Sequence, residues 1–233
     1  MSYKRVMLKL SGESLAGSDK HGIDEEQINA FAQMIKEVHN LGIELAIVVG
    51  GGNFWRGRNN QHMDRTTADQ IGMLATTMNA MVLADAVKQK GVKCRVMNAI
   101  DMPRIVEPYV QSKAVDYLRD KTVLIFAGGT GCPFFSTDSA AALRAAEINA
   151  DIVLKATLVD GVYDKDPNKS SDAKKFKEIS FTELIADDLK VMDSTAAALC
   201  RDNDLSILVF SIEDPMNVVR ILQGENLGTI VKS

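Results

Sequence analysis

The sequence contains little cysteine, and no two cysteines have metal-binding or redox spacing. Its 233 residues include only Cys94, Cys132 and Cys200, and no CxxC motif occurs. An odd number of widely spaced cysteines argues against a disulfide framework and against a cysteine-rich zinc site. Cysteine usage therefore favours a reducing compartment, and we expect a cytoplasmic protein.

Long apolar segments and an excess of positive charge are also missing. The first apolar run extends only from Val6 to Leu10 without a small-residue cleavage pattern, and no later stretch approaches a membrane-spanning length. The formal net charge of -4 gives no general attraction to nucleic acid or to an anionic membrane. We therefore expect no membrane association and no nucleic-acid binding, and any phosphate must be bound by locally placed groups.

Two common nucleotide-binding motifs are absent as well. No GxxxxGK[ST] sequence occurs, and GGTGCPF has Phe134 where a GxGxxG pattern requires its third glycine. These departures disfavour a P-loop kinase and a standard NAD site.

Short apolar runs alternate with helical patterns along one α/β domain spanning residues 1–233. A hydrophobic fraction of 46% with 25% charged residues is ordinary for a soluble globular protein. The runs that we interpret as buried strands are RVMLKL, IELAIVV, KCRVM, TVLIFA, DIVLKA and LSILVF. Helical patterns cover Ile28 to Val38 and Thr67 to Lys90, with Gly42 and Gly91 as helix ends and Asp214-Pro215 as a helix start. This alternation predicts a mainly parallel sheet covered on both faces.

Three glycine-bearing segments follow predicted strands: LKLSGES, VVGGGNFWRG and FAGGTGCPFFSTD. Loops at the carboxyl ends of parallel strands gather along one sheet edge, and glycine lets their N–H groups converge on phosphate oxygens. The candidate phosphate-binding residues are Gly12, Gly50, Gly51, Gly52, Gly128, Gly129 and Gly131. A single loop is equally well explained by its turn, but three together favour ligand binding.

Six segments, in this order, make the chain resemble the UMP kinases of the amino-acid-kinase superfamily. They are KLSGES, GGGNFWRG, GMLATTMN, GGTGCPFFSTDSAA, LKATLVDGVYDKDP and VMDSTAA, and the similarity runs from about Lys4 to the end. The resemblance implies an αβα sandwich of three layers, with transfer of a phosphoryl group from ATP to UMP. It also implies that the N-terminal part mainly binds UMP and the C-terminal part mainly binds ATP.

The family pattern assigns ligand contacts to individual residues. Those implied for ATP are Lys9, Leu10, Ser11, Gly12, Gly52, Arg56, Thr157, Tyr163 and Asp166. Those implied for UMP are Gly51, Asp69, Thr130, Gly131, Cys132, Pro133, Phe134, Phe135, Ser136 and Thr137. Cys132 replaces an asparagine of many relatives and is a weaker donor and acceptor. Lys155 varies in the family, so we do not place it among the indispensable residues.

The resemblance implies catalytic roles for Lys9, Arg56, Asp138 and Asp193. We expect the Lys9 ammonium to stay in contact with the phosphoryl group during its transfer, while Arg56 and Mg²⁺ neutralise neighbouring phosphate oxygens. No protein residue is assigned as a dedicated metal ligand. Asp138 either orients lysines, binds magnesium through water or caps a helix. Asp193 likewise has capping as an alternative role.

Regulation and assembly are implied by the resemblance alone. It suggests a homohexamer that UTP inhibits and GTP activates. A segment tied to GTP response in some relatives corresponds to Gly17, Ser18, Asp19, Lys20, His21 and Gly22, where a plain surface loop is an equal alternative. Two other functions stay open: a related carboxylate kinase that makes an acyl phosphate, and a uridine-nucleotide sensor without catalysis.

Overall fold

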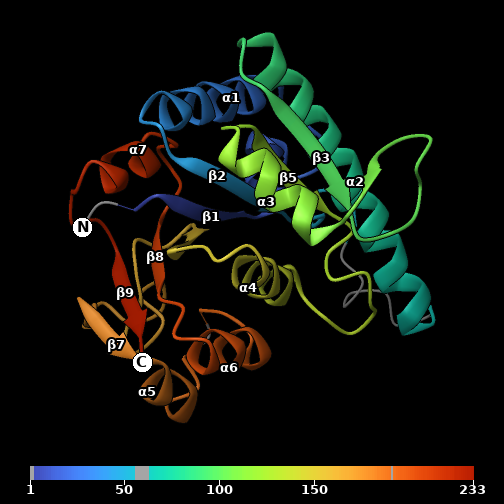
Figure 1. The fold of residues 1–233 in the computed structure, drawn as a ribbon. Helices are drawn as coiled ribbons and strands as arrows, with labels where there is room; N and C mark the ends of the chain where they lie inside the picture. The colour runs from blue at the N-terminus through green and yellow to red at the C-terminus, as the bar shows by residue number, and fades with distance from the viewer. Residues whose placement is uncertain (1–2, 56–62, 190) are drawn as a thin grey trace.

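One nine-stranded sheet organises the fold (Figure 1). The computed structural model describes residues 3–55, 63–189 and 191–233. The strands are β1 (Arg5–Leu10), β2 (Glu44–Val49), β3 (Cys94–Asn98), β4 (Glu107–Pro108), β5 (Val123–Ala127), β6 (Ile152–Thr157), β7 (Glu178–Ser180), β8 (Ile207–Ser211) and β9 (Thr229–Lys232). They lie in the order β4-β3-β5-β2-β1-β6-β8-β9-β7, and β8–β9 is the antiparallel pair in an otherwise parallel ladder. The six predicted strands and the mainly parallel sheet are confirmed.

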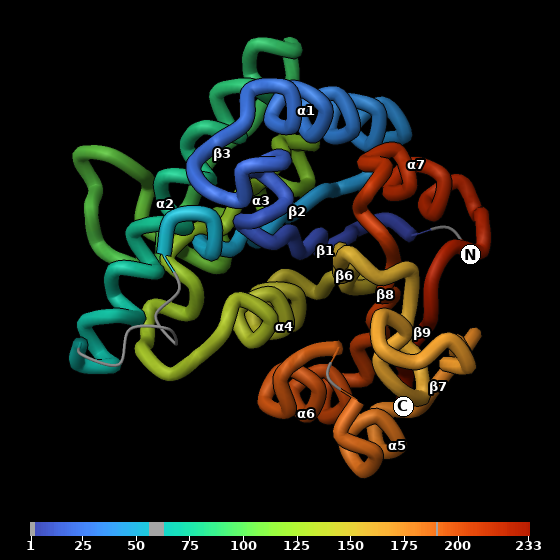
Figure 2. Tube along the Cα trace, turned by 180° about the vertical axis from the view of Figure 1, so that it is seen from behind, coloured from blue at the N-terminus to red at the C-terminus, as the bar shows by residue number. Residues whose placement is uncertain are grey.

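Helices cover both faces of this sheet, as Figure 2 shows from behind. They are α1 (Glu25–Asn40), α2 (Arg65–Gln89), α3 (Gln111–Arg119), α4 (Thr137–Glu147), α5 (Phe181–Ala186), α6 (Ser194–Asp202) and α7 (Asn217–Leu222), with short 3-10 turns η1 (Gly12–Leu15) and η2 (Gly17–Asp19). One core contains buried side chains of α1, α2 and α7, and the other contains those of α3, α4, α5 and α6. The three-layer αβα architecture is therefore confirmed. None of the helices within the described ranges is long and apolar enough to cross a membrane.

Side-chain alternation along β1 decides which face carries its lysine. Val6, Leu8 and Leu10 pack in the core under α1, α2 and α7, whereas Met7 packs in the core on the opposite face. Because successive strand residues point to opposite faces, Lys9 extends toward the side of Met7 and α4.

The order of the central strands places the loops that follow β1, β2, β5 and β6 along one edge. From β1 the chain first builds the sheet on the side of β2 and β5, and later returns on the other side as β6. Such a reversal of strand order leaves a crevice at the carboxyl ends of the strands, where ligands bind in open α/β sheets.

Two of the predicted helix boundaries are confirmed and one is wrong. Gly42 and Gly91 follow the ends of α1 and α2 with φ angles of 76° and 83°, which glycine adopts without steric cost. Asp214 and Pro215 instead form a turn before α7, which begins at Asn217. The Asp214 carboxylate accepts the N–H of Met216 at 2.9 Å, so it stabilises this turn rather than the first turn of the helix.

Candidate active site

The three glycine loops meet beside the central strands. The N–H of Gly50 donates to the carbonyl of Leu10 at 2.9 Å, which joins the loops after β2 and β1. Gly12 lies against the loop after β2, so a Cβ atom added to Gly12 would be 2.7 Å from the backbone nitrogen of Gly52. Only glycine permits this approach, because the contacting atom belongs to backbone.

Polar residues buried on α2 fix these loops in place. The hydroxyl of Thr76 accepts the N–H of Gly128 at 2.8 Å, and the amide of Asn79 donates to the carbonyl of Gly50 at 2.7 Å. Asn79 also exchanges hydrogen bonds of 2.7 and 3.0 Å with the side chain of Asn53. The GMLATTMN segment of α2 thus holds the loops after β2 and β5 by hydrogen bonds.

Lys9, Lys155 and Asp138 form a cluster at the crevice. Lys9 and Lys155 are register partners on β1 and β6. The ammonium nitrogen of Lys9 lies 2.8 Å from Oδ1 of Asp138, and that of Lys155 lies 2.5 Å from Oδ2. Two cations on one carboxylate leave the cluster with an excess positive charge, which is suited to an anionic ligand.

Burial and mutual charge change the acidity of two members of this cluster. Burial alone would raise the pKa of Asp138, but the ammonium groups of Lys9 and Lys155 outweigh it and lower the pKa to about 2. Burial, together with the charge of Lys9, lowers the pKa of Lys155 to about 8 despite the opposing effect of Asp138. Asp138 is therefore a firmly ionised partner, while Lys155 can lose its charge in mildly alkaline solution.

The two predicted acidic residues differ in their relation to helix ends. The N-cap of α4 is Ser136, not Asp138, so the capping alternative for Asp138 is wrong. Asp193 is the N-cap of α6 and accepts the N–H of Ala196 at 2.9 Å. The carboxylate of Asp193 also accepts hydrogen bonds from the hydroxyls of Ser136 and, at 3.0 Å, Ser139. It thereby ties the N-terminus of α4 to that of α6.

A cavity of about 190 Å³, which we call the α2 cavity, lies between α2 and the loop after β5. The residues implied for UMP that line it are Gly51, Asp69, Thr130, Cys132, Phe135, Ser136 and Thr137. Gly131, Pro133 and Phe134 belong to the same loop but do not line the cavity. Trp55 closes one side, where its indole N–H donates to the carbonyl of Ala68 at 2.8 Å.

A second cavity of about 690 Å³, the β6 cavity, lies beyond the carboxyl ends of β1 and β6. The residues implied for ATP that line it are Lys9, Ser11, Thr157, Tyr163 and Asp166. Leu10, Gly12 and Gly52 do not line it: Leu10 is fully buried, and Gly12 packs against the loop after β2. Arg56 lies outside the described residues.

The polar groups of the β6 cavity are partly engaged with their own loops. The Thr157 hydroxyl donates to the carbonyl of Val159, and the Tyr163 hydroxyl donates to Asp160 at 2.7 Å. Asp166 accepts the N–H of Asn168 at 3.0 Å. These contacts shape the loops around the cavity.

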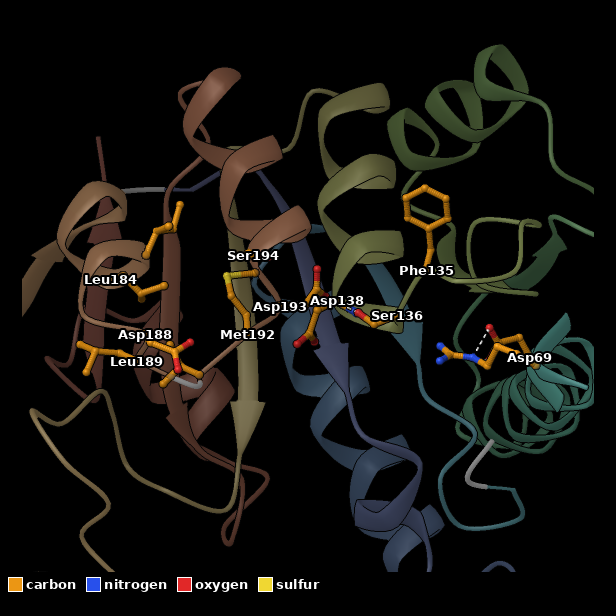
Figure 3. A pocket seen from close by; sticks show the side chains of 13 residues that line it. Asp69, Phe135, Ser136, Asp138, Leu184, Asp188, Leu189, Met192, Asp193 and Ser194 are labelled. Atoms are coloured by element: carbon orange, nitrogen blue, oxygen red, sulfur yellow. Dashed lines mark hydrogen bonds and ion pairs between the residues drawn. The ribbon is translucent and has the colours of Figure 1, made fainter. Parts of the chain in front are cut away.

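A third hollow of about 630 Å³, the central cleft, lies between the segment around α5 and α6 and the first turn of α2. Figure 3 shows Asp138, Asp193 and Ser136 in its middle, with Asp188 and Leu189 on one side. Asp69 and Phe135 lie on the other side and also line the α2 cavity. The cleft thus connects the Asp138 cluster to the α2 cavity.

The segment Gly17 to Gly22 contacts the glycine loop that follows β2. The N–H of Gly22 donates to the carbonyl of Asn53 at 3.1 Å, and the Asn53 amide donates to the carbonyl of Gly22 at 2.6 Å. The His21 ring lies edge-on to Phe54, with centroids 6.2 Å apart. The end of the segment is therefore tied to the loop after β2, while Ser18, Asp19, Lys20 and His21 are exposed at the surface.

No group of three or more His, Cys, Asp or Glu side chains within residues 3–55, 63–189 and 191–233 is arranged to hold a metal ion. Both carboxylate oxygens of Asp138 are already next to lysine ammonium groups, so Asp138 does not fit as a direct metal ligand.

Sequence and structure comparisons agree on the family. Residues 4–211 match the amino acid kinase family. The chain belongs to this family. Its fold superimposes on the UMP kinase from Bacillus anthracis with a TM-score of 0.96 at 36% identity, covering 100% of this chain and 97% of the other. The UMP kinase from Ureaplasma parvum superimposes with a TM-score of 0.93 at 37% identity, and 100% of both chains is covered. The uridylate kinase from Archaeoglobus fulgidus gives 0.74 at 29% identity over 97% and 99% of the chains.

Two charged residues of this amino acid kinase stand out in the structure but not in the sequence. Lys155 is buried beside Asp138, although the family resemblance does not mark it as indispensable. Arg65 forms an ion pair with Asp69 at 2.8 Å beside the central cleft. A lysine inside an otherwise apolar strand is the sequence feature that could have identified Lys155. Arg65 has no such feature, because its spacing from Asp69 is that of an ordinary helix ion pair.

Proposed function

We propose that the protein transfers the γ-phosphoryl group of MgATP to UMP and releases UDP and MgADP. The observation that carries this proposal is the Lys9, Asp138 and Lys155 cluster at the edge of the β6 cavity, with the central cleft leading from it to the α2 cavity. Full-length similarity to UMP kinases supports the choice of UMP as the acceptor.

The two nucleotides occupy different halves of the site in this proposal. UMP binds in the α2 cavity, so its contacts come mainly from the N-terminal part, including Gly51, Asp69 and the segment from Thr130 to Thr137. ATP binds in the β6 cavity against Thr157 and Tyr163, mainly in the C-terminal part. The phosphate of UMP and the γ-phosphate of ATP then meet near the Asp138 cluster.

The chemistry needs positioning and charge stabilisation more than a base. A phosphate oxygen of UMP, already ionised, forms a bond to the γ-phosphorus, and the bond from that phosphorus to the β–γ bridging oxygen breaks. Lys9 neutralises the moving group, Lys155 supplies a second positive charge, and Asp138 keeps both ammonium groups oriented. Arg56, which lies outside the described residues, is proposed to neutralise neighbouring phosphate oxygens. Asp193 supports the site by holding the N-terminus of α4.

Magnesium is proposed to enter the site with ATP. Mg²⁺ keeps several water ligands and is bound mainly through nucleotide phosphates, with few protein carboxylates. It supplies charge neutralisation at the β- and γ-phosphates when bound. This arrangement agrees with the engagement of Asp138 by two lysines.

Two alternatives make different substrate predictions. A carboxylate kinase would phosphorylate an amino-acid acceptor such as N-acetylglutamate, and a nucleotide sensor would bind UMP or UTP without turnover. A coupled ADP-release assay with UMP, CMP and N-acetylglutamate separates them. We expect UMP to be preferred clearly, while preference for either rival acceptor overturns the assignment and binding without turnover supports a sensor.

Assembly and regulation are proposed from the family resemblance. We propose a cytoplasmic homohexamer that UTP inhibits and GTP activates. The hydrogen bonds between Gly22 and Asn53 support a role for the 17–22 segment in regulation, because they connect it to the glycine loop after β2. Activity with and without GTP, in the wild type and in His21→Ala, tests this role. An identical GTP response in both would remove His21 from it.

A further inference from the structure

The first turn of α2 carries an ion pair that helix electrostatics does not favour. Arg65 is the first residue of α2, directly after the N-cap Asp64. A helix N-terminus favours negative charge, and an arginine four residues before an acid is the weaker orientation of such a pair. Nevertheless, Nε of Arg65 lies 2.9 and 2.8 Å from the two carboxylate oxygens of Asp69. Helix stability alone therefore does not explain this pair.

Asp69 connects the ion pair to the loop after β5. Its Oδ2 atom accepts the N–H of Phe134 at 2.8 Å. Phe134 has a φ angle of 72°, a left-handed conformation that is unusual for a bulky residue and needs support from its surroundings. The guanidinium carbon of Arg65 lies 5.6 Å from the centroid of the Phe134 ring, within cation–π range. Arg65 thus holds Phe134 both through Asp69 and directly.

This clamp adjoins the cavity that we assign to the acceptor. Asp69 lines both the α2 cavity and the central cleft, and Arg65 lines the cleft. Figure 3 shows Asp69 with its ion pair on the same side of the cleft as Phe135. Phe135 and Ser136, the residues directly after Phe134, line the α2 cavity. A change in the backbone of Phe134 therefore moves cavity walls.

We propose that Arg65 is a positioning residue for the acceptor, an inference that rests on the proposed UMP kinase function. Arg65 orients the Asp69 carboxylate, and together they hold Phe134 and the Thr130 to Thr137 segment in the conformation that receives UMP. Since Arg65 does not line the β6 cavity, its effect falls on UMP rather than on ATP.

The kinetic test uses Arg65→Ala, Asp69→Asn and the double variant, with Arg119→Ala as a matched control. Arg119 forms an exposed ion pair with Asp116 on α3. For Arg65→Ala we expect the KM for UMP to rise about tenfold, as for loss of a charge-assisted hydrogen bond, with kcat and the KM for ATP within about twofold. Arg65→Lys recovers part of the loss, because it keeps the charge but not the fork of donors. The control variant behaves as the wild type.

The double variant decides whether Arg65 acts through Asp69. If it does, adding Arg65→Ala to Asp69→Asn increases the KM for UMP only slightly further. Multiplication of the two single effects overturns the proposal, as does an equal rise in the KM for ATP. Hydrogen exchange at the Phe134 amide of the ligand-free protein reports on the clamp without any substrate. Arg65→Ala should accelerate the exchange of this amide. Unchanged exchange overturns the clamp, whether or not UMP is the substrate. Absence of UMP turnover in the wild type is a separate result, which refutes the proposed function.

Discussion

Lys9 and Lys155 occupy the same register position on the neighbouring strands β1 and β6, and their ammonium groups share the carboxylate of Asp138. Side-chain alternation directs both lysines to the α4 face of the sheet. Burial strengthens the interaction of all three charges, so the cluster is tightly held and still has one positive charge in excess. That charge faces the crevice in which two anionic nucleotides have to approach each other.

Replacement of Lys9 by alanine should remove transition-state stabilisation without unfolding the protein. We expect kcat to fall on the order of a hundredfold or more, equivalent to roughly 3 kcal/mol. Steady-state kinetics at saturating UMP and MgATP measure the loss, and circular dichroism checks the fold. Lys93→Ala, which removes an exposed lysine paired with Asp120, is the control and should retain full activity. Nearly unchanged turnover in Lys9→Ala would exclude Lys9 from the mechanism.

Lys155 should set an alkaline limit on activity. Because its pKa is lowered to about 8, the ammonium is charged below that pH and neutral above it. If the charged form supports transfer, kcat/KM, which reports groups of the ligand-free enzyme, falls as the pH rises through about 8. Lys155→Arg should shift this limit to higher pH, since a guanidinium stays protonated. A pH–rate profile of both proteins is the measurement, and the same alkaline limit in both would contradict the role of Lys155.

Asp138→Asn should lower the free energy of unfolding and should lower the pH above which the enzyme loses activity. The pKa of Asp138 is lowered from 3.8 to about 2, so its ionisation stabilises the folded state above the ordinary pKa, and this contribution is lost as the pH falls toward 2. At neutral pH the variant should lose about 3 kcal/mol of unfolding free energy, because two buried cations lose their partner.

Two measurements check the effects of Asp138→Asn. Denaturant unfolding at neutral and acidic pH should show that the difference from the wild type shrinks on acidification. Without its carboxylate partner the pKa of Lys155 should fall further, so the alkaline limit of activity moves to lower pH. A stability difference independent of pH, together with an unmoved alkaline limit, would argue that the cluster is not coupled in this way.

Thr76→Val should loosen the loop after β5. Valine keeps the volume of threonine but leaves the buried N–H of Gly128 without its acceptor, which costs about 1–3 kcal/mol of unfolding free energy. We also expect a higher KM for UMP, because Thr130 follows this turn in the α2 cavity. Thr76→Ser keeps the hydroxyl and should retain wild-type binding. Wild-type stability and KM in Thr76→Val would show that this hydrogen bond does not hold the loop.

Most strands that the sequence predicts are buried on both faces, whereas β3, predicted from KCRVM, has Arg95 exposed. RVMLKL and TVLIFA become β1 and β5, near the centre of the sheet, because nearly every side chain in them has an apolar partner. β4, β7 and β9 lie toward the sheet edges, are only two to four residues long and have few apolar residues, so no run indicates them. The helix start predicted at Asp214-Pro215 is wrong, because the same two residue types are also favourable in a turn.

The candidate site shows where a linear pattern stops being informative. The glycine loops and Asp138 could be assigned by motif, but the pairing of Lys155 with Lys9 depends on strand register, which the motif does not contain. Asp193 caps α6 and also accepts hydrogen bonds from Ser136 and Ser139, while its catalytic role stays a prediction. Arg65 shows its relation to Phe134 only once α2 and the loop after β5 are side by side.

The most direct test of the account is the stoichiometry of the reaction catalysed by the wild-type protein. Phosphorus NMR of a mixture of UMP and MgATP follows both nucleotides and their products at once. The account predicts that UMP and ATP disappear together and that UDP and ADP form in equal amounts. Consumption of ATP without UDP, or no transfer to UMP by the folded protein, would contradict it.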